Sequence, residues 1–343
     1  MRFNSLQFGK AMSAALFVLL LSVVGTKNVL AQTQVATLQH GDDISVFYGP
    51  NAFVQAHGAA THGDIITLSS GTFVGCNITK AITLRGAGCA IDTVTNTYPT
   101  SFDRLVSLRM SSNTSNYLTI EGILFTEQVT THNRLDNPKF NKCTFTSLSP
   151  GYGTMYDAQF DNCIIDYFDF RYTQNTVLIN SVIWQPGFIS NDYPVVLYNS
   201  IMKLADYSFS GLSAYNSIII KANNVYNSEP SPTCSFINCI GINLYNHNPF
   251  GLGSTINCTI YHSYEAVFES FTGNFSLDEL FILKDEIATS ILGNDGTQVG
   301  IYGGFLPYSN IPSYMLRTNV SVPNRSNIDG TLNVEIEVID DDQ

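Results

Sequence analysis

The sequence predicts an all-β fold, a parallel β-solenoid of about ten coils, on two observations. The first is a repeat of about 19 residues, which is too short for a pair of packed helices. The second is a composition with 12% aromatic and 13% charged residues, which suits a large β-rich core. Seven segments carry the repeat, each with a Cys or Ser at its fourth position, and these residues are spaced 20, 18, 19, 17, 22 and 19 positions apart: Cys143, Cys163, Ser181, Ser200, Ser217, Cys239 and Cys258.

Residues 1–31 are typical of a secretory signal peptide. Arg2 and Lys10 precede an apolar stretch over residues 11–24, and residues 29–31 fit the cleavage positions. Roughly 14 apolar residues are fewer than the 20 or so that a spanning helix needs, so we expect export rather than an uncleaved anchor. The mature chain is then expected to have no stable membrane span and to be secreted, displayed on the cell surface or periplasmic.

The charge of the chain disfavours nucleic acid as a partner. The net charge is −12, and removal of the signal would leave 13 basic and 28 acidic residues, a net charge of −15. Phosphate backbones are bound by clustered Lys and Arg, which this chain lacks. The same acidity disfavours polyanionic polysaccharides unless a metal ion bridges the two.

Residues 32–63 are predicted to form a polar lead-in and a capping helix at the N-terminal end of the solenoid. Pro50 suits a first helical turn, and Ala52, Phe53 and Ala56 follow at helical spacing. A cap is needed because an open end exposes apolar side chains and unpaired strand edges. The β-helix itself is predicted over residues 64–270.

Within the repeat, two columns of apolar residues predict the core. Since successive strands stack in register, residues at the same repeat position lie above one another. The columns lie three residues before and two residues after the Cys or Ser: Phe140, Phe160, Leu178, Leu197, Ala214, Phe236 and Thr255, and then Phe145, Ile165, Ile183, Met202, Ile219, Gly241 and Ile260.

An Asn directly precedes the Cys or Ser in six of the seven segments. The chain must bend sharply there, and Asn tolerates the left-handed backbone conformation better than other residues with a side chain. Gly122 fits the same requirement one coil earlier, whereas Lys142 departs from it. Stacked Asn amides can also hydrogen-bond from coil to coil. We therefore predict a structural ladder rather than a ligand site at Asn162, Asn180, Asn199, Asn216, Asn238 and Asn257.

The cysteines at the repeat position are predicted to be free thiols. Adjacent coils place equivalent Cα atoms about 4.8 Å apart with parallel Cβ vectors, which a disulfide does not favour. Two other pairings stay open, Cys76 with Cys89 and Cys234 with Cys239. The odd number of cysteines leaves at least one without an intramolecular partner.

Residues 271–343 are predicted to form a C-terminal cap. A capping-box pattern indicates a short helix from Ser276 to Leu283. Residues 314–322 and 331–338 alternate as strands and are expected to pair as a hairpin across Asp329-Gly330.

Residues 64–88 resemble the opening coils of secreted right-handed parallel β-helix proteins of the pectin-lyase-like superfamily. Residues 295–308, DGTQVGIYGGFLPY, are similar to a segment near the end of many uncharacterised bacterial members. The resemblance covers most of residues 36–338 and implies a single-stranded right-handed parallel β-helix. It implies no particular reaction, because both segments are structural in character.

The best local match to the chemistry of β-helix lyases is DYFDFRY, residues 166–172. Such lyases resemble one another in an acidic cluster that holds Ca²⁺ and an Arg or Lys that removes a proton. Carboxylates two coils apart, at about 10 Å, are too distant to share one Ca²⁺ but near the separation found in inverting glycosidases. The candidate catalytic residues are Asp166, Asp169, Arg171, Lys203 and Asp206, and the alternative is a solvated surface with an ion pair of Arg171.

Aromatic residues are dense in the same coils and suggest a carbohydrate-binding surface, because exposed Tyr and Trp rings stack on sugars. The candidate ligand-binding residues are Tyr167, Tyr172, Trp184 and Tyr207. No two His have the spacing of a zinc motif, so we expect no metal site.

Two functions remain in view. The first is a non-catalytic exported module that contacts glycan or another surface and needs no cofactor. The second is a polysaccharide lyase or glycoside hydrolase with a shallow groove, and only the lyase would require Ca²⁺.

Overall fold

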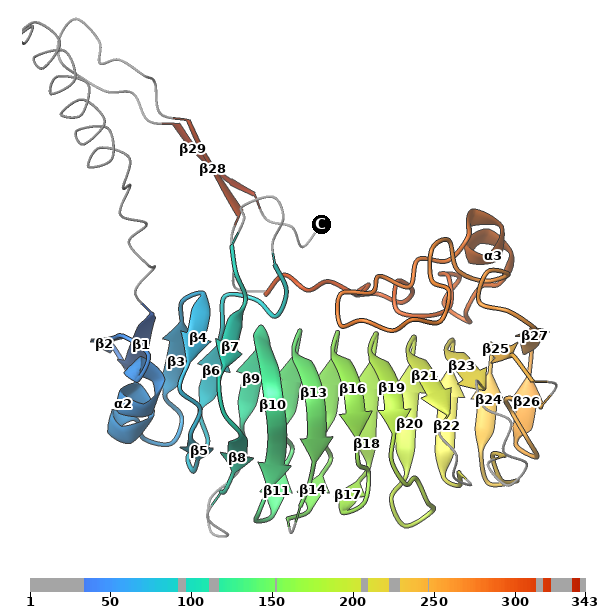
Figure 1. Cartoon of the computed structure of the whole chain (residues 1–343), viewed down its shortest axis with the longest axis horizontal. Helices are drawn as coiled ribbons and strands as arrows, with labels where there is room; N and C mark the ends of the chain where they lie inside the picture. The colour runs from blue at the N-terminus through green and yellow to red at the C-terminus, as the bar shows by residue number, and fades with distance from the viewer. Residues whose placement is uncertain are drawn as a thin grey trace, which may run out of the picture. The chain divides into compact units, whose positions relative to one another are not determined.

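The computed structural model describes residues 34–91, 97–110, 117–151, 153–204, 209–221, 229–245, 247–312, 317–321 and 335–339. The predicted signal peptide, residues 1–31, lies outside the described residues. The described chain is an all-β solenoid of stacked parallel strands with about nine turns, close to the expected ten (Figure 1).

Two long sheets form the body of the solenoid. Sheet A contains, in spatial order, β2 (Asp43–Tyr48), β1 (Val35–His40), β3 (Ile65–Leu68), β6 (Thr83–Arg85), β9 (Thr119–Glu121), β12 (Lys139–Asn141), β15 (Gln159–Asp161), β18 (Thr176–Ile179), β20 (Val195–Tyr198), β22 (Leu212–Tyr215), β24 (Ser235–Ile237) and β26 (Ser254–Ile256). From β3 to β26 each strand pairs in parallel with the next, as a winding chain requires.

After each parallel strand of sheet A, the chain continues into a strand of sheet B. Its main path is β4 (Gly71–Phe73), β7 (Thr100–Phe102), β10 (Ile123–Thr131), β13 (Thr144–Ser149), β16 (Ile164–Phe168), β19 (Val182–Pro186), β21 (Ile201–Leu204), β23 (Ile218–Lys221), β25 (Ile240–Asn243) and β27 (Thr259–Tyr261), with β5 (Asn77–Ile78) and β8 (Val106–Leu108) beside it. A short third sheet in the middle coils contains β11 (Leu135–Asp136), β14 (Met155–Tyr156) and β17 (Thr173–Gln174).

The two predicted columns form the core between the sheets. All members other than Gly241, Thr255 and Ile260 are fully buried. Gly241 is buried beside Phe250, whereas Thr255 and Ile260 of the last coil are exposed. Phe140 and Phe160 stack with ring centroids 4.8 Å apart, so like packs on like from coil to coil.

The serines at the repeat position form a series of hydrogen bonds from coil to coil at the edge of the core. The hydroxyl oxygen of Ser181 accepts the backbone N–H of Cys163, and Ser200 accepts that of Ser181 in the same way, at 3.0 and 3.1 Å. Ser217 continues the series with the N–H of Ser200. The column therefore satisfies backbone donors that the turn leaves unpaired.

All seven cysteines, each of them among the described residues, are free. Neither of the two pairings left open by the sequence is formed. Burial raises the pKa of the Cys163 and Cys239 thiols well above the ordinary value, so both stay protonated. As thiols they donate weak hydrogen bonds to the carbonyls of Phe140 and Ala214.

At the N-terminal end, the predicted helix is present as α2 (Ala52–Ala59), but the polar lead-in is more ordered than expected. Residues 35–48 form a hairpin, β1 with β2, and β1 pairs antiparallel with β3. The hairpin therefore covers the edge of the first parallel strand. Phe53 of α2 is fully buried against Phe102, with ring centroids 4.9 Å apart.

Within the predicted C-terminal cap, the described residues up to 312 run back along the side of the coils (Figure 1). Residues 264–312 are called the return segment. The predicted helix at Ser276–Leu283 is absent, and the helix of this segment is α3 (Asp285–Ser290) instead. The predicted hairpin is present as an antiparallel pair, β28 (Arg317–Ser321) with β29 (Glu335–Ile339).

The return segment builds a second hydrophobic core on the outer face of sheet B. This face is apolar, because it presents Ile164, Val182, Ile201, Ile218 and Ile240, one from each of five successive coils. Burying an aliphatic side chain of this size contributes about 1.5–3 kcal/mol, so the face favours a cover. The return segment supplies it with Tyr264, Val267, Phe268, Phe271, Phe281, Leu283, Ile287, Val299 and Ile301.

The Asn column lies at the turn from sheet A to sheet B and binds the return segment. All six asparagines have a positive φ, between 47° and 54°. The amide of Asn180 donates to the carbonyls of Ile301 and Gly303 at 2.8 and 2.7 Å. Asn216 exchanges hydrogen bonds with Asn294. Amide contacts from coil to coil, as the sequence predicted, occur at the last coils, between Asn216, Asn238 and Asn257.

No helix among the described residues is both long and apolar enough to cross a bilayer.

Replacement of Asn180 tests the two roles of the column separately. Asn180→Gly keeps the left-handed turn and removes both bonds to the return segment, so we expect a loss of about 1–3 kcal/mol in the free energy of unfolding. Asn180→Ala should lose about 1–2 kcal/mol more because of its Cβ. Urea denaturation measures both. Asn257→Gly is the matched control, since Asn257 is exposed and, within the described chain, its amide donates to Asn238 alone. Equal losses at the two sites would contradict this account.

The docking of α2 predicts a pH dependence. His57 is buried and accepts the N–H of Thr79, and burial, followed by the charge of Lys80, lowers its pKa from 6.5 to about 4. As the pH falls, the unfolded chain is protonated first, so stability is full above pH 6.5 and declines toward pH 4. The free energy of unfolding should fall by about 2 kcal/mol between pH 7.5 and pH 5 from this group. In His57→Gln this part of the decline should vanish, and an unchanged profile would refute it.

Candidate functional site

The centre of the sequence-predicted site is an ion pair between Asp169 and Arg171. The guanidinium binds both carboxylate oxygens, with Nη2 2.7 Å from Oδ2 and Nε 3.0 Å from Oδ1. The backbone N–H of Arg171 also donates to Oδ1. The carboxylate is the buried partner, since the side chain of Asp169 is 8% exposed and that of Arg171 is 58% exposed.

Three other candidates, Asp166, Tyr167 and Tyr172, belong to the same short segment of the chain. Asp166 accepts a hydrogen bond from the amide of Gln185 in the next coil, at 2.9 Å. Tyr167 and Tyr172 lie close enough to Arg171 to contribute to its raised pKa, after the larger effect of Asp169. Tyr172 is 49% exposed and adopts a left-handed backbone conformation.

Trp184 and Lys203 belong to a different environment, the second core. Trp184 is only 6% exposed because it stacks on Phe275 at 4.8 Å and meets the edge of Phe271 at 5.4 Å, both from the return segment. The ammonium of Lys203 lies 4.4 Å from the centroid of the Trp184 ring. The prediction that Trp184 offers an open ring to a sugar is therefore wrong, since the return segment covers it.

The structure thus separates the predicted residues instead of lining them along one groove. Asp169 and Arg171 pair just after β16 with Tyr167 and Tyr172 close to Arg171, whereas Lys203 lies over the ring of Trp184, which the return segment covers. Asp206 and Tyr207 lie outside the described residues.

This arrangement is poorly suited to lyase or hydrolase chemistry. A lyase base must be able to lose its proton, but the hydrogen bonds and charge of Asp169 raise the pKa of Arg171 further above its ordinary value. The Asp169 carboxylate already accepts bonds at both oxygens. Among the described residues, no group of three or more His, Cys, Asp and Glu side chains is placed to hold a metal ion.

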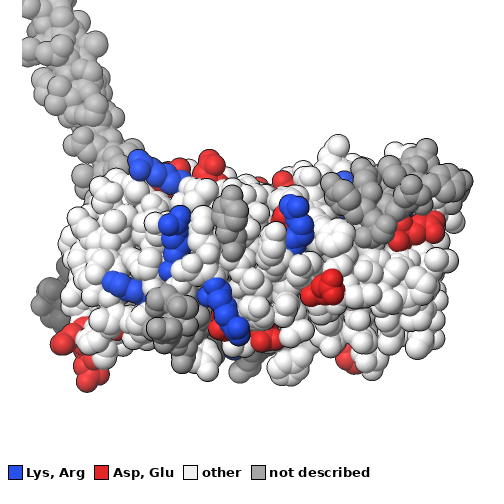
Figure 2. Space-filling model, turned by 90° about the horizontal axis from the view of Figure 1, so that it is seen from below, with Lys and Arg blue, Asp and Glu red and all other residues white. Residues whose placement is uncertain are grey.

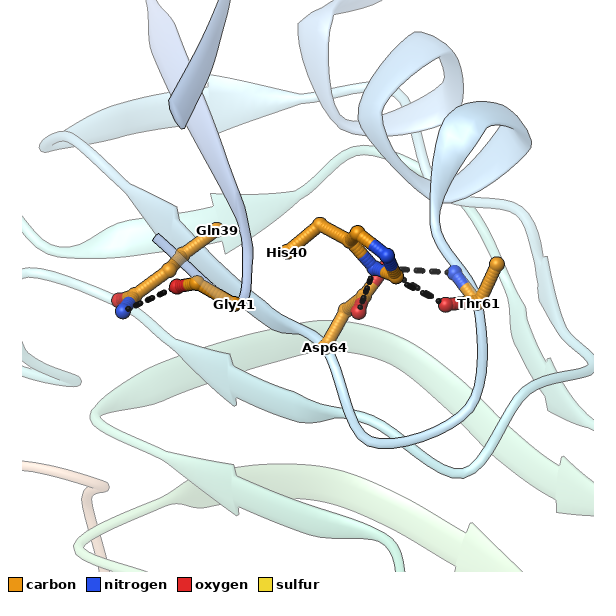
Figure 3. Close-up of polar contacts among 5 residues, drawn as sticks. All are labelled: Gln39, His40, Gly41, Thr61 and Asp64. Atoms are coloured by element: carbon orange, nitrogen blue, oxygen red, sulfur yellow. Dashed lines mark hydrogen bonds and ion pairs between the residues drawn. The ribbon is translucent and has the colours of Figure 1, made fainter. Parts of the chain in front are cut away.

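A second polar constellation lies near the N-terminal end, where Thr61, His40 and Asp64 meet (Figure 3). The Nδ1 atom of His40 is 2.7 Å from Asp64 Oδ1 and 3.2 Å from Thr61 Oγ1. A catalytic triad needs the hydroxyl and the carboxylate at opposite ring nitrogens, whereas here both meet the same nitrogen. Burial raises the pKa of Asp64, but bonds from Thr61 and His40 outweigh it and hold the pKa below its ordinary value. The cluster fixes the turn between α2 and β3.

An apolar stripe lies on the outer face of sheet A. Neighbouring strands align its residues directly: Ile179, Tyr198, Tyr215, Ile237 and Ile256. Tyr198 is 41% exposed, and its ring stacks on that of Tyr215 with centroids 5.1 Å apart and planes 16° apart. The same column begins with polar residues in earlier coils, Arg85, Glu121, Asn141 and Asp161.

Charged side chains are sparse on the solenoid. The face drawn in Figure 2 shows only scattered Lys, Arg, Asp and Glu over a mostly uncharged surface. The stripe of sheet A contains no charged residue from Ile179 to Ile256. A partner of this surface therefore needs no charge of its own.

Comparison of the chain with protein-family models, with curated proteins and with solved structures gives no match.

The asymmetric burial of the ion pair predicts unequal mutant effects. Arg171→Gln leaves a buried carboxylate without its cation and should lower the free energy of unfolding by about 2–3 kcal/mol at pH 7. Asp169→Asn leaves an exposed guanidinium in water and should cost about 1 kcal/mol or less. Urea denaturation at pH 7 measures both losses, and a larger loss for Asp169→Asn than for Arg171→Gln would contradict this account.

Proposed function

We propose that this chain is an exported, non-catalytic binding module that contacts an uncharged glycan through the apolar stripe of sheet A. The observation that carries the proposal is the stacked pair of Tyr198 and Tyr215, which stands in that stripe on the outer face. Exposed aromatic side chains are those that proteins use to hold the apolar faces of sugars.

The geometry of the stripe suits an extended ligand. Its residues recur once per coil at about 4.8 Å, so they form a flat, regular row rather than a pocket. Flanking strand positions carry small polar groups, Ser213, Ser235 and Ser254, which can bond sugar hydroxyls beside the row. The negative net charge of the chain favours a neutral glycan over an acidic one.

Export is part of the proposal and is supported by the signal-like residues 1–31. The resemblance of residues 64–88 and 295–308 to secreted pectin-lyase-like β-helix proteins supports the same expectation. A binding surface of this kind requires no cofactor, and Ca²⁺ would enter only with a lyase. Whether the ligand belongs to a secreted polysaccharide or to a cell surface, the contact chemistry is the same.

A glycan array tests the proposal. The purified chain should bind at least one neutral glycan, and the double variant Tyr198→Ala, Tyr215→Ala should weaken that binding about tenfold or more, which corresponds to about 1.4 kcal/mol. Tyr117→Ala is the matched control, because Tyr117 is 70% exposed but precedes β9 outside the stripe. Equal binding by wild type and double variant would contradict the proposed surface.

The same glycans separate binding from catalysis. New reducing or unsaturated ends after incubation, abolished by Asp169→Asn, would replace the binding module with the lyase or hydrolase alternative.

A further inference from the structure

In the described part of the chain, the C-terminal end of the solenoid is open. All three residues of β26 are exposed, and so are Thr259 and Ile260 of β27. Thr255 and Ile260 occupy the two core columns, and their counterparts in the preceding coils are buried. Ile260 is 39% exposed although the same position is fully buried at Ile219, two coils earlier.

The backbone edge is open as well. Among the described strands, β26 and β27 each stand last in their sheets and pair with the strand of the preceding coil alone. Exposed parallel edges normally carry protection, such as an inward charge, a proline or a covering loop, because they recruit other strands. Residues 254–261 contain neither proline nor a charged residue.

The opposite end presents a strand edge, β2, but no open core. The helix α2 covers the core there, since its Phe53 is fully buried against Phe102. An association that buries the open core columns of the last coil must therefore bring the same end of two copies together, with a two-fold axis between them.

The distribution of charge favours a second copy of the chain as the partner of the open end. Two molecules of net charge −12 repel one another through most faces, yet residues 230–264, the last two coils, contain no Asp, Glu, Lys or Arg. Like ends can therefore meet without placing like charges together. Leu252 and Ile256, at 69% and 55% exposed, add apolar surface at this end.

We propose that the chain forms an end-to-end dimer in which the last coils of two copies stack, with β26 of one copy antiparallel to β26 of its partner. Ile260 then completes the core that ends in solvent in the single chain, and the free N–H and C=O groups of the edge are paired. This proposal is independent of the glycan-binding function.

Sedimentation velocity of the purified chain over a range of concentrations tests the dimer. We expect a concentration-dependent species of twice the 37.7 kDa mass of the chain. Ile260→Lys should raise the dissociation constant by tenfold or more, because it places two ammonium groups at the two-fold axis. Ile44→Lys is the matched control, since Ile44 is an exposed isoleucine on the edge strand β2 at the other end, and it should leave the dimer unchanged.

Hydrogen exchange distinguishes the other occupants. Amides of residues 254–261 should become more protected as the concentration of the chain rises, and Ile260→Lys should remove that gain while its circular dichroism stays that of the wild type. Protection that is independent of concentration would mean that a segment of the same chain covers the end, and the proposal would be wrong. A chain that stays monomeric, or a dimer that only Ile44→Lys disrupts, would also overturn it.

Discussion

The bend from sheet A to sheet B is the constraint on which the rest of the structure depends. Each coil must turn there in a left-handed conformation, and an Asn does so at Asn162 and again at five later coils. A Gly could make the same turn, as Gly122 does, but it would offer no amide. Because Asn180 and Asn216 turn their amides toward the return segment, the residue that winds the chain also fixes the C-terminal residues along its side.

The return segment in turn depends on close approach to this column. A Cβ atom at Gly303 would lie 2.6 Å from the amide nitrogen of Asn199 and 1.8 Å from the carbonyl oxygen of Gln298. Only glycine fits such a position. The N–H of Gly300 donates to the backbone carbonyl of Asn216 at 2.8 Å. Gly300 and Gly303 are therefore explained by contact with the coils, whereas the sequence by itself indicates only turns there.

The winding could be predicted from the sequence because its determinants repeat within about 19 residues. The core columns, the left-handed turns and the free thiols all follow from one register. The position of residues 264–312 could not be predicted, because their partners lie far away in the sequence. The N–H of Ser309, for example, donates to the side chain of Asn162, 147 positions earlier. The burial of Trp184 was missed for the same reason. Lys221, fully buried where the preceding coil has Leu204, shows that the columns also change character without a signal in the repeat.

Contacts in the candidate site could be predicted from the sequence only between residues that are close together in the chain. Asp169 and Arg171 are two residues apart, so their pairing as an ion pair was foreseeable, and it was the alternative to catalysis. An aromatic surface in these coils was predicted, but the alignment of Tyr198 and Tyr215 in one stripe was harder to predict, because both precede the Asn, a position that is polar in earlier coils at Asn141 and Asp161. Outward positions are free to vary along a solenoid, since no core packing restrains them.

The return segment also changes how the solenoid resists unfolding. In a simple stack each coil contacts only its neighbours, so the open end frays one coil at a time. Here the second core joins five coils, from Ile164 to Ile240, to one covering chain. Releasing the coil of β25 exposes part of that cover, and the loss is shared by the coils beneath it. The coil of β26 and β27 contributes Thr259 where its neighbours contribute isoleucine or valine. This last coil therefore gains the least stability from the return segment. Its stability depends most on whatever binds the open edge of β26 and β27.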